Sequence, residues 1–198
     1  MSQVKVSGNA SGTGVLTISA PNTNSNYTLT LPANTGTLVT NATAGTVLQV
    51  LQTVKTDGFS ITGGAAYVDL TGLSVTITPS SATSKILVMF SMYAVQQGTT
   101  GTYAAQARLV RNSTNIYVGD AAGSAQQASA SIGSTNYNYP QALTGTFLDS
   151  PATTSATTYK IQVYGETGQN QYIGGSYNTS AAYDARVPSQ ILVMEIAA

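Results

Sequence analysis

Short stretches of alternating apolar and polar residues recur along the chain, and none has the spacing of an amphipathic helix. In residues 159–165, YKIQVYG, Ile161 and Val163 alternate with Lys160 and Gln162, which is the period of a strand with one solvated face. Nine such stretches, most of them separated by turn-forming residues, predict an all-β, antiparallel sandwich or jelly roll. They cover residues 46–54, 65–70, 74–79, 84–95, 103–112, 114–119, 142–149, 157–165 and 189–196.

Two of the predicted strands lose the alternation. Residues 85–92, KILVMFSM, and 191–196, ILVMEI, are apolar on both faces. A strand of an antiparallel sandwich normally has one wet face, so a second surface must cover these two. Because the chain has no spare helix or third sheet, we expect other copies of the same chain to supply that surface in a symmetric oligomer. The alternative is that long loops of the same chain cover the strands.

The first 44 residues carry shorter strand patterns and too few apolar residues for a core of their own. Within them, residues 29–40, LTLPANTGTLVT, have the pattern of a hairpin, which is marginally stable alone. We expect this hairpin to be ordered only where other chains complete it. The sequence therefore predicts an N-terminal β-rich anchor or stem (1–44) and a C-terminal jelly-roll knob (45–198). The candidate anchor residues are Leu29, Leu31, Leu38 and Val39.

Charge and cysteine content exclude several classes of protein. The 198 residues include seven basic and seven acidic residues without a basic patch, so nucleic-acid binding is not expected. The chain has no Cys, which leaves packing and oligomerisation as its sources of stability. No apolar run reaches the roughly 18 residues of a membrane span, and the first residues lack the layout of a signal peptide. We therefore expect neither membrane insertion nor export by the secretory route.

An enzyme would have little chemistry to draw on. The chain has no His, which removes the commonest general base, the usual serine triad and imidazole metal sites. Asp57 and Asp149 are expected in turns, and Glu195, inside an apolar strand, is expected in a buried salt bridge, for example with an Arg. We predict no enzymatic activity, no cofactor and no metal. Hydrolysis of a polysaccharide by paired carboxylates, the remaining enzymatic alternative, would use Asp57, Asp69, Asp120, Asp149, Asp184, Glu166 or Glu195.

The sequence resembles structural proteins of tailed bacteriophages. Residues 12–57, which contain TLTLP, GTL and GTVLQV in that order, resemble a module of tail-fibre and other fibrous phage proteins. The segments 68–92, 145–165 and 188–198 are similar to phage C-terminal domains related in architecture to the trimeric jelly roll of tumour necrosis factor.

This resemblance implies a homotrimer in the virion, assembled in the host cytoplasm, with residues 1–44 joined to other virion proteins. The chain has no shaft repeat, coiled-coil heptads or collagen-like repeat, which indicates a short fibre or spike. A head fibre or a capsid-decorating cement protein with a purely structural role is the alternative.

Three polar stretches, 96–103, 119–140 and 165–188, are predicted to be loops, and rigid scaffolds tend to carry function on loops. Tyr among small polar residues is typical of adaptable binding surfaces. We expect these loops to contact a glycan or protein of the host surface. The alternative is that the tyrosines pack a subunit interface or cover sandwich edges. The candidate receptor-binding residues are Tyr137, Tyr139, Asn170, Gln171, Tyr172, Tyr177, Asn178 and Tyr183.

Overall fold

The computed structural model describes most of the chain after residue 43. The described residues are 44–97, 103–134, 139–176, 178–180, 182 and 184–198, with 11–15, 17, 22–26 and 28 in the N-terminal part. The chain divides into two compact units, Met1–Thr37 and Leu38–Ala198. The four candidate anchor residues, Leu29, Leu31, Leu38 and Val39, lie outside the described residues, and their hairpin stays a prediction.

The described residues form eleven β-strands and no helix. The first sheet contains β1 (Val47–Lys55), β2 (Phe59–Thr62), β4 (Lys85–Gln97), β8 (Gln141–Asp149), β10 (Asn170–Ile173) and β11 (Ser189–Ile196). The second contains β3 (Ala66–Ile77), β5 (Tyr103–Arg111), β6 (Thr114–Ile116), β7 (Ala130–Ser134) and β9 (Thr157–Gly165).

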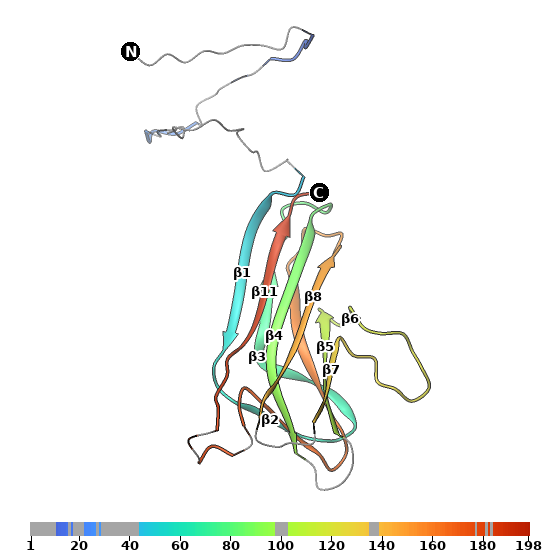
Figure 1. Cartoon of the computed structure of the whole chain (residues 1–198). Helices are drawn as coiled ribbons and strands as arrows, with labels where there is room; N and C mark the ends of the chain where they lie inside the picture. Colours follow the sequence, from blue (N-terminus) through green and yellow to red (C-terminus); the bar gives the residue numbers. More distant parts are fainter. Residues whose placement is uncertain are drawn as a thin grey trace. The chain divides into compact units, whose positions relative to one another are not determined.

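The two sheets pack as the layers of a sandwich (Figure 1). In the six-stranded sheet, β1, β11, β4 and β8 are antiparallel neighbours, and β10 replaces β11 beside the last residues of β4, with β2 outside it. In the five-stranded sheet, β9 lies between β3 and β5, while β6 and β7 pair with successive parts of β5. Every strand pair in both sheets is antiparallel. The predicted all-β antiparallel sandwich is therefore confirmed.

The core lies between the sheets, and strict alternation places its side chains there. Along β9 every second residue is buried, as the pattern of residues 159–165 predicted. The β4 and β11 strands alternate in the same way, because one parity of each faces the core and the other faces outward. The inward-facing residues include Ile86, Val88, Phe90, Met92, Leu109, Leu143, Tyr159, Ile161, Val163, Ile191 and Val193.

The structure corrects several predicted boundaries. The two strands predicted at 65–70 and 74–79 correspond to one strand, β3 (Ala66–Ile77), whose register shifts between Asp69 and Ser74. Gly72, at φ 84°, takes the left-handed conformation inside this bulge, which glycine adopts without strain. The predicted loops 119–140 and 165–188 contain β7 and β10, and β2 was not predicted at all. These three strands have four or five residues each, too short for a periodic pattern to emerge.

Glu195 is fully buried, but its partners differ from the predicted salt bridge. Its carboxylate accepts hydrogen bonds from Gln49 Nε2 (2.6 Å), Ser80 N (2.7 Å) and Ser80 Oγ (2.7 Å) rather than from an Arg. Burial alone raises the pKa of Glu195, but the hydrogen bonds from Gln49 and Ser80 outweigh it and lower the pKa to about 2. The carboxylate therefore ties β11 to β1 and to the segment after β3.

We expect this carboxylate to make the fold sensitive to acid. Since the pKa of Glu195 is lowered from 4.5 to about 2, its stabilisation is complete above pH 4.5 and is lost as the pH falls toward 2. The loss is on the order of 3 kcal/mol. Glu195→Gln should lower the free energy of unfolding at pH 7 and flatten its decline between these pH values, measured by denaturant unfolding. Parallel curves for wild type and variant would contradict this, and exposed Glu166→Gln is the matched control.

Asp149 is also buried instead of capping an exposed turn. Arg111 Nη1 lies 2.8 Å from Asp149 Oδ1 and 2.9 Å from Oδ2, and the Tyr159 hydroxyl donates to Oδ2 at 2.7 Å. Burial, together with the neighbouring carboxylate, raises the pKa of Tyr159, so its hydroxyl stays protonated and available as a donor. This cluster links β8, β5 and β9 across the two sheets.

Candidate functional site

The outer face of the six-stranded sheet carries apolar residues in adjacent rows. In one row, Val50, Met194, Leu87 and Leu148 lie side by side on β1, β11, β4 and β8. In the next row, Leu192 on β11 pairs with Met89 on β4. We call these six residues the apolar face: Val50, Leu87, Met89, Leu148, Leu192 and Met194.

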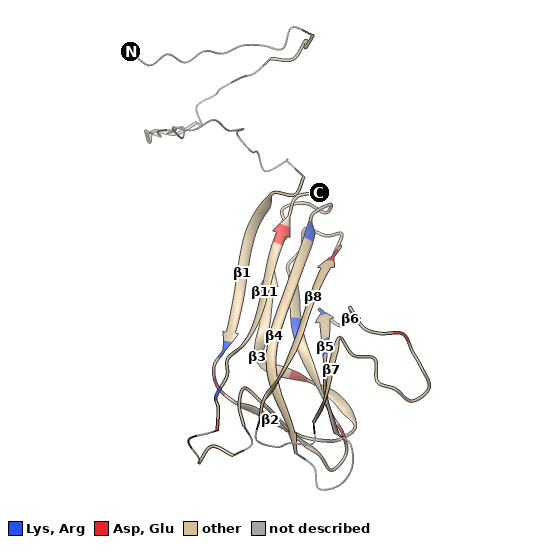
Figure 2. Ribbon diagram, in the orientation of Figure 1, with Lys and Arg blue, Asp and Glu red and all other residues tan. Residues whose placement is uncertain are grey.

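Much of the apolar face is open to solvent in the single chain. The exposed fractions are 51% for Val50, 41% for Met89 and 53% for Leu148, and the other three side chains are partly buried. Charged residues occur in these four strands only at or next to the strand ends. Figure 2 shows the middle of each of these strands in tan, the colour of uncharged residues. No described segment of the chain covers these exposed side chains, so the alternative that long loops cover these strands is not met by the described loops.

The outer face of the five-stranded sheet is polar and hydrogen-bonded. Lys160 Nζ and Gln162 Nε2 donate to the Asp69 carboxylate at 2.8 and 2.7 Å, and Arg108 Nε donates to Gln162 Oε1 at 2.8 Å. This hydrogen-bonded polar surface, shared by β3, β9 and β5, is suited to water. The asymmetry singles out the apolar face, since contiguous exposed apolar surface marks an interaction site.

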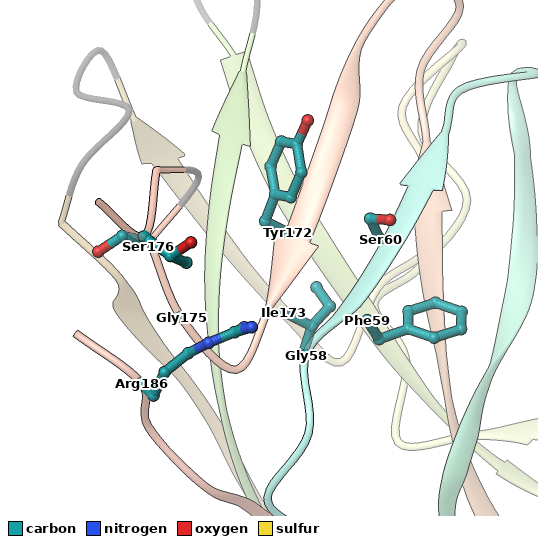
Figure 3. A pocket seen from close by; sticks show the side chains of 9 residues that line it. Gly58, Phe59, Ser60, Tyr172, Ile173, Gly175, Ser176 and Arg186 are labelled. Atoms are coloured by element: carbon teal, nitrogen blue, oxygen red, sulfur yellow. The ribbon is translucent and has the colours of Figure 1, made fainter. Parts of the chain in front are cut away.

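A second feature is a polar pocket where β2 and β10 meet the segment that precedes β11. Its volume is about 310 Å³. Figure 3 shows the Arg186 side chain reaching toward Gly58, with Tyr172 on β10 and Ser60 on β2 nearby. The residues that line this pocket are Gly58, Phe59, Ser60, Tyr172, Ile173, Gly175, Ser176, Thr179 and Arg186.

The candidate receptor-binding residues lie in different parts of the structure. Tyr172 lines the pocket, Tyr139 is 57% exposed, and Asn178 is exposed and accepts a hydrogen bond from Ser180 Oγ at 2.8 Å. Asn170 is the partly buried first residue of β10. Gln171 needs correction, because its side chain faces the interior and donates to the Tyr164 carbonyl instead of reaching a receptor. Tyr137, Tyr177 and Tyr183 lie outside the described residues.

Sequence reasoning missed the other pocket residues. Gly58 is the second residue of the Asp57–Gly58 turn, and β2 begins directly after it with Phe59 and Ser60. These three residues reach the pocket only because β2 pairs with β10. Arg186 stands alone as a basic residue in a polar stretch, and that was the one signal available in the sequence.

Within the described residues, no group of three or more Asp and Glu residues is placed to hold a metal ion. None of the described segments is a helix long and apolar enough to cross a membrane.

Comparison with known proteins adds little. No family model matches the chain, and no curated protein matches it. Among solved structures, it is similar to a chain from the structure of infectious bursal disease virus, Gx strain, with 15% identity and a TM-score of 0.38. The similarity covers 78% of this chain and 39% of the viral chain. At this identity and TM-score it carries no functional argument, and the function proposed below rests on the residues of the chain.

Proposed function

We propose that the protein is a non-enzymatic structural protein of a bacteriophage virion, a short homotrimeric fibre or spike. Residues 1–44 attach it to other virion proteins, and the far end of the sandwich binds the host surface. The observation that carries this proposal is the apolar face, which a single chain leaves exposed. The resemblance of residues 12–57 to phage fibrous proteins supports the virion assignment, and that of the later segments supports a trimer.

Self-association through the apolar face accounts for a sequence feature that a monomer leaves unexplained. Residues 85–92 and 191–196 are apolar on both parities, and their inner parity already fills the core. Obligate interfaces resemble a core cut in half, with charged residues depleted at the centre. The rows around Leu87 and Met89 have this composition, with apolar residues at the centre and no charged residue among them. A second copy of the same chain is a partner that is present wherever the protein assembles.

The two ends of the sandwich support a division of roles. The chain enters at Gly45, whose N–H donates to the Ala197 carbonyl at 2.7 Å, beside the start of β4. The pocket residues on β10 lie beside the other end of β4, and the thirteen residues between those ends span roughly 40 Å. A sandwich held by its N-terminal segment would therefore present the Tyr172 end away from the attachment point.

Competition with intact phage tests the attachment role. The purified full-length protein should bind host cells and reduce phage adsorption at least tenfold when it saturates the receptors. A purely structural head fibre or cement protein would leave adsorption unchanged at any concentration, and that result would contradict host binding. Release of reducing ends from host polysaccharide by the protein would contradict its non-enzymatic role.

A further inference from the structure

We propose that the Arg186 pocket is a subsite for a hexose ring carrying one anionic group, as in a uronic acid or a phosphorylated sugar of a cell-surface glycan. This proposal deepens the host-binding function and rests on it. The pocket's volume of about 310 Å³ falls at the lower end of ligand sites, a size that suits a single sugar unit.

The backbone on both sides of the pocket holds Arg186 in place. Arg186 forms an antiparallel bridge with Gly175, and the flanking hydrogen bonds join Ser176 N to the Ala185 carbonyl (2.9 Å) and Val187 N to the Gly174 carbonyl (3.2 Å). The Ser176 hydroxyl accepts a further bond from Ala185 N at 3.1 Å. The segment that carries Arg186 is thus fixed to the end of β10, which places the guanidinium before any ligand arrives.

Two glycines leave room for the guanidinium. A Cβ at Gly58 would lie 2.3 Å from Arg186 Nη1, and a Cβ at Gly175 would lie 2.8 Å from Arg186 Cδ. Figure 3 shows the side chain extended between these two backbone segments. Any larger residue at Gly58 would push the guanidinium out of its position.

The charge balance leaves Arg186 available for an anion. The other described Lys and Arg side chains each donate to a named protein group, whereas Arg186 belongs to none of the three ion pairs of the described residues. Asp57, the carboxylate beside the pocket, is paired with Lys55 at 2.8 Å, although the Arg186 charge also contributes to its lowered pKa. Asp184 does not line the pocket. A guanidinium in this setting favours a carboxylate or phosphate through paired hydrogen bonds.

The remaining lining groups fit a sugar ring. Tyr172 supplies an aromatic surface, and Ser60 and Thr179 supply exposed hydroxyls. Aromatic rings with nearby hydroxyls recognise rings that have an apolar face and polar edges. The combination of one cation, one aromatic ring and several hydroxyls therefore favours an anionic sugar over an apolar ligand.

Three probes test the subsite on the full-length protein by titration calorimetry. These are a hexuronic acid oligosaccharide, its carboxyl-reduced neutral counterpart and a hexose 6-phosphate. At least one anionic probe should bind tenfold or more tightly than the neutral one, and Arg186→Gln should remove that preference. Tighter binding of the hexuronic acid oligosaccharide would identify the anionic group as a carboxylate, and tighter binding of the hexose 6-phosphate would identify it as a phosphate. Equal binding of all three probes, or no binding of any, would overturn the proposal.

Two variants separate charge from folding. Lys85→Gln removes a cation at the opposite end of the sandwich, where Lys85 Nζ donates to Ser150 Oγ at 2.8 Å, and should bind the probes as wild type does. Gly58→Ala keeps every charge but displaces the guanidinium, and should weaken anion binding severalfold. Wild-type affinity in both Arg186→Gln and Gly58→Ala would show that the anion binds elsewhere.

The adsorption assay separates this proposal from the host-binding role. A protein that reduces adsorption but binds no anionic probe would retain the host-binding function and lose the subsite. A protein that binds the anionic probe through Arg186 without affecting adsorption would retain the subsite and contradict host binding.

Discussion

Met89→Asp is expected to convert the proposed trimer into a monomer. Met89 lies in the middle of the apolar face, on the central strand β4, between Leu192 and Thr146. In the single chain its side chain is 41% exposed, so a carboxylate there remains solvated and the sandwich still folds. In a trimer that buries this face, three carboxylates would lose water without a partner, at a cost of several kcal/mol each. Sedimentation velocity at micromolar concentration measures the result.

The matched control places the same charge on the other sheet. Thr76 on β3 is exposed, and its hydroxyl lies 2.8 Å from that of Thr158 on the polar outer face. Thr76→Asp should remain trimeric with the wild-type sedimentation coefficient. If Met89→Asp also remains trimeric while circular dichroism shows the native fold, the apolar face is not the subunit interface.

Asp149→Ala is expected to have the largest effect on folding stability. The substitution leaves Arg111 without its carboxylate and leaves the buried Tyr159 hydroxyl without an acceptor. Breaking a buried ion pair from one side costs about 3–5 kcal/mol. We expect a loss of about 3 kcal/mol here, because the Tyr159 hydroxyl stays buried without an acceptor whereas the Arg111 side chain is 26% exposed and regains some water. Guanidinium chloride unfolding measures the loss, at one fixed protein concentration because the proposed association would itself stabilise the fold.

The control removes a carboxylate from an exposed pair. Asp69 accepts from Lys160 at 2.8 Å, with its side chain 51% exposed. Asp69→Ala should cost about 1 kcal/mol or less, because water screens and replaces such a pair. Equal losses for Asp69→Ala and Asp149→Ala would contradict the role assigned to burial.

Periodicity in the sequence was sufficient to predict the sandwich. In β9, Tyr159, Ile161 and Val163 alternate with Lys160 and Gln162, and that repetition identifies both the strand and its inner face. The absence of alternation in residues 85–92 and 191–196 also located the apolar face, because extra apolar residues on the outer parity are visible in the sequence.

Features that depend on tertiary pairing could not be predicted. β10 has four residues and is held by pairing to β2 on one side and β4 on the other, which no local pattern reports. The pocket combines residues near positions 58, 172 and 186, so it exists only after those pairings form. The partners of Glu195 and Asp149 likewise come from distant segments, and the sequence identified each as a buried or turn carboxylate without showing what it would meet.

The mass of the full-length protein in solution tests the central claim most directly. Self-association through the apolar face predicts a single species at three times the chain mass of 20.3 kDa in sedimentation equilibrium, unchanged on dilution through the micromolar range. A species at 20.3 kDa over the same range would contradict the proposal that copies of this chain cover the face.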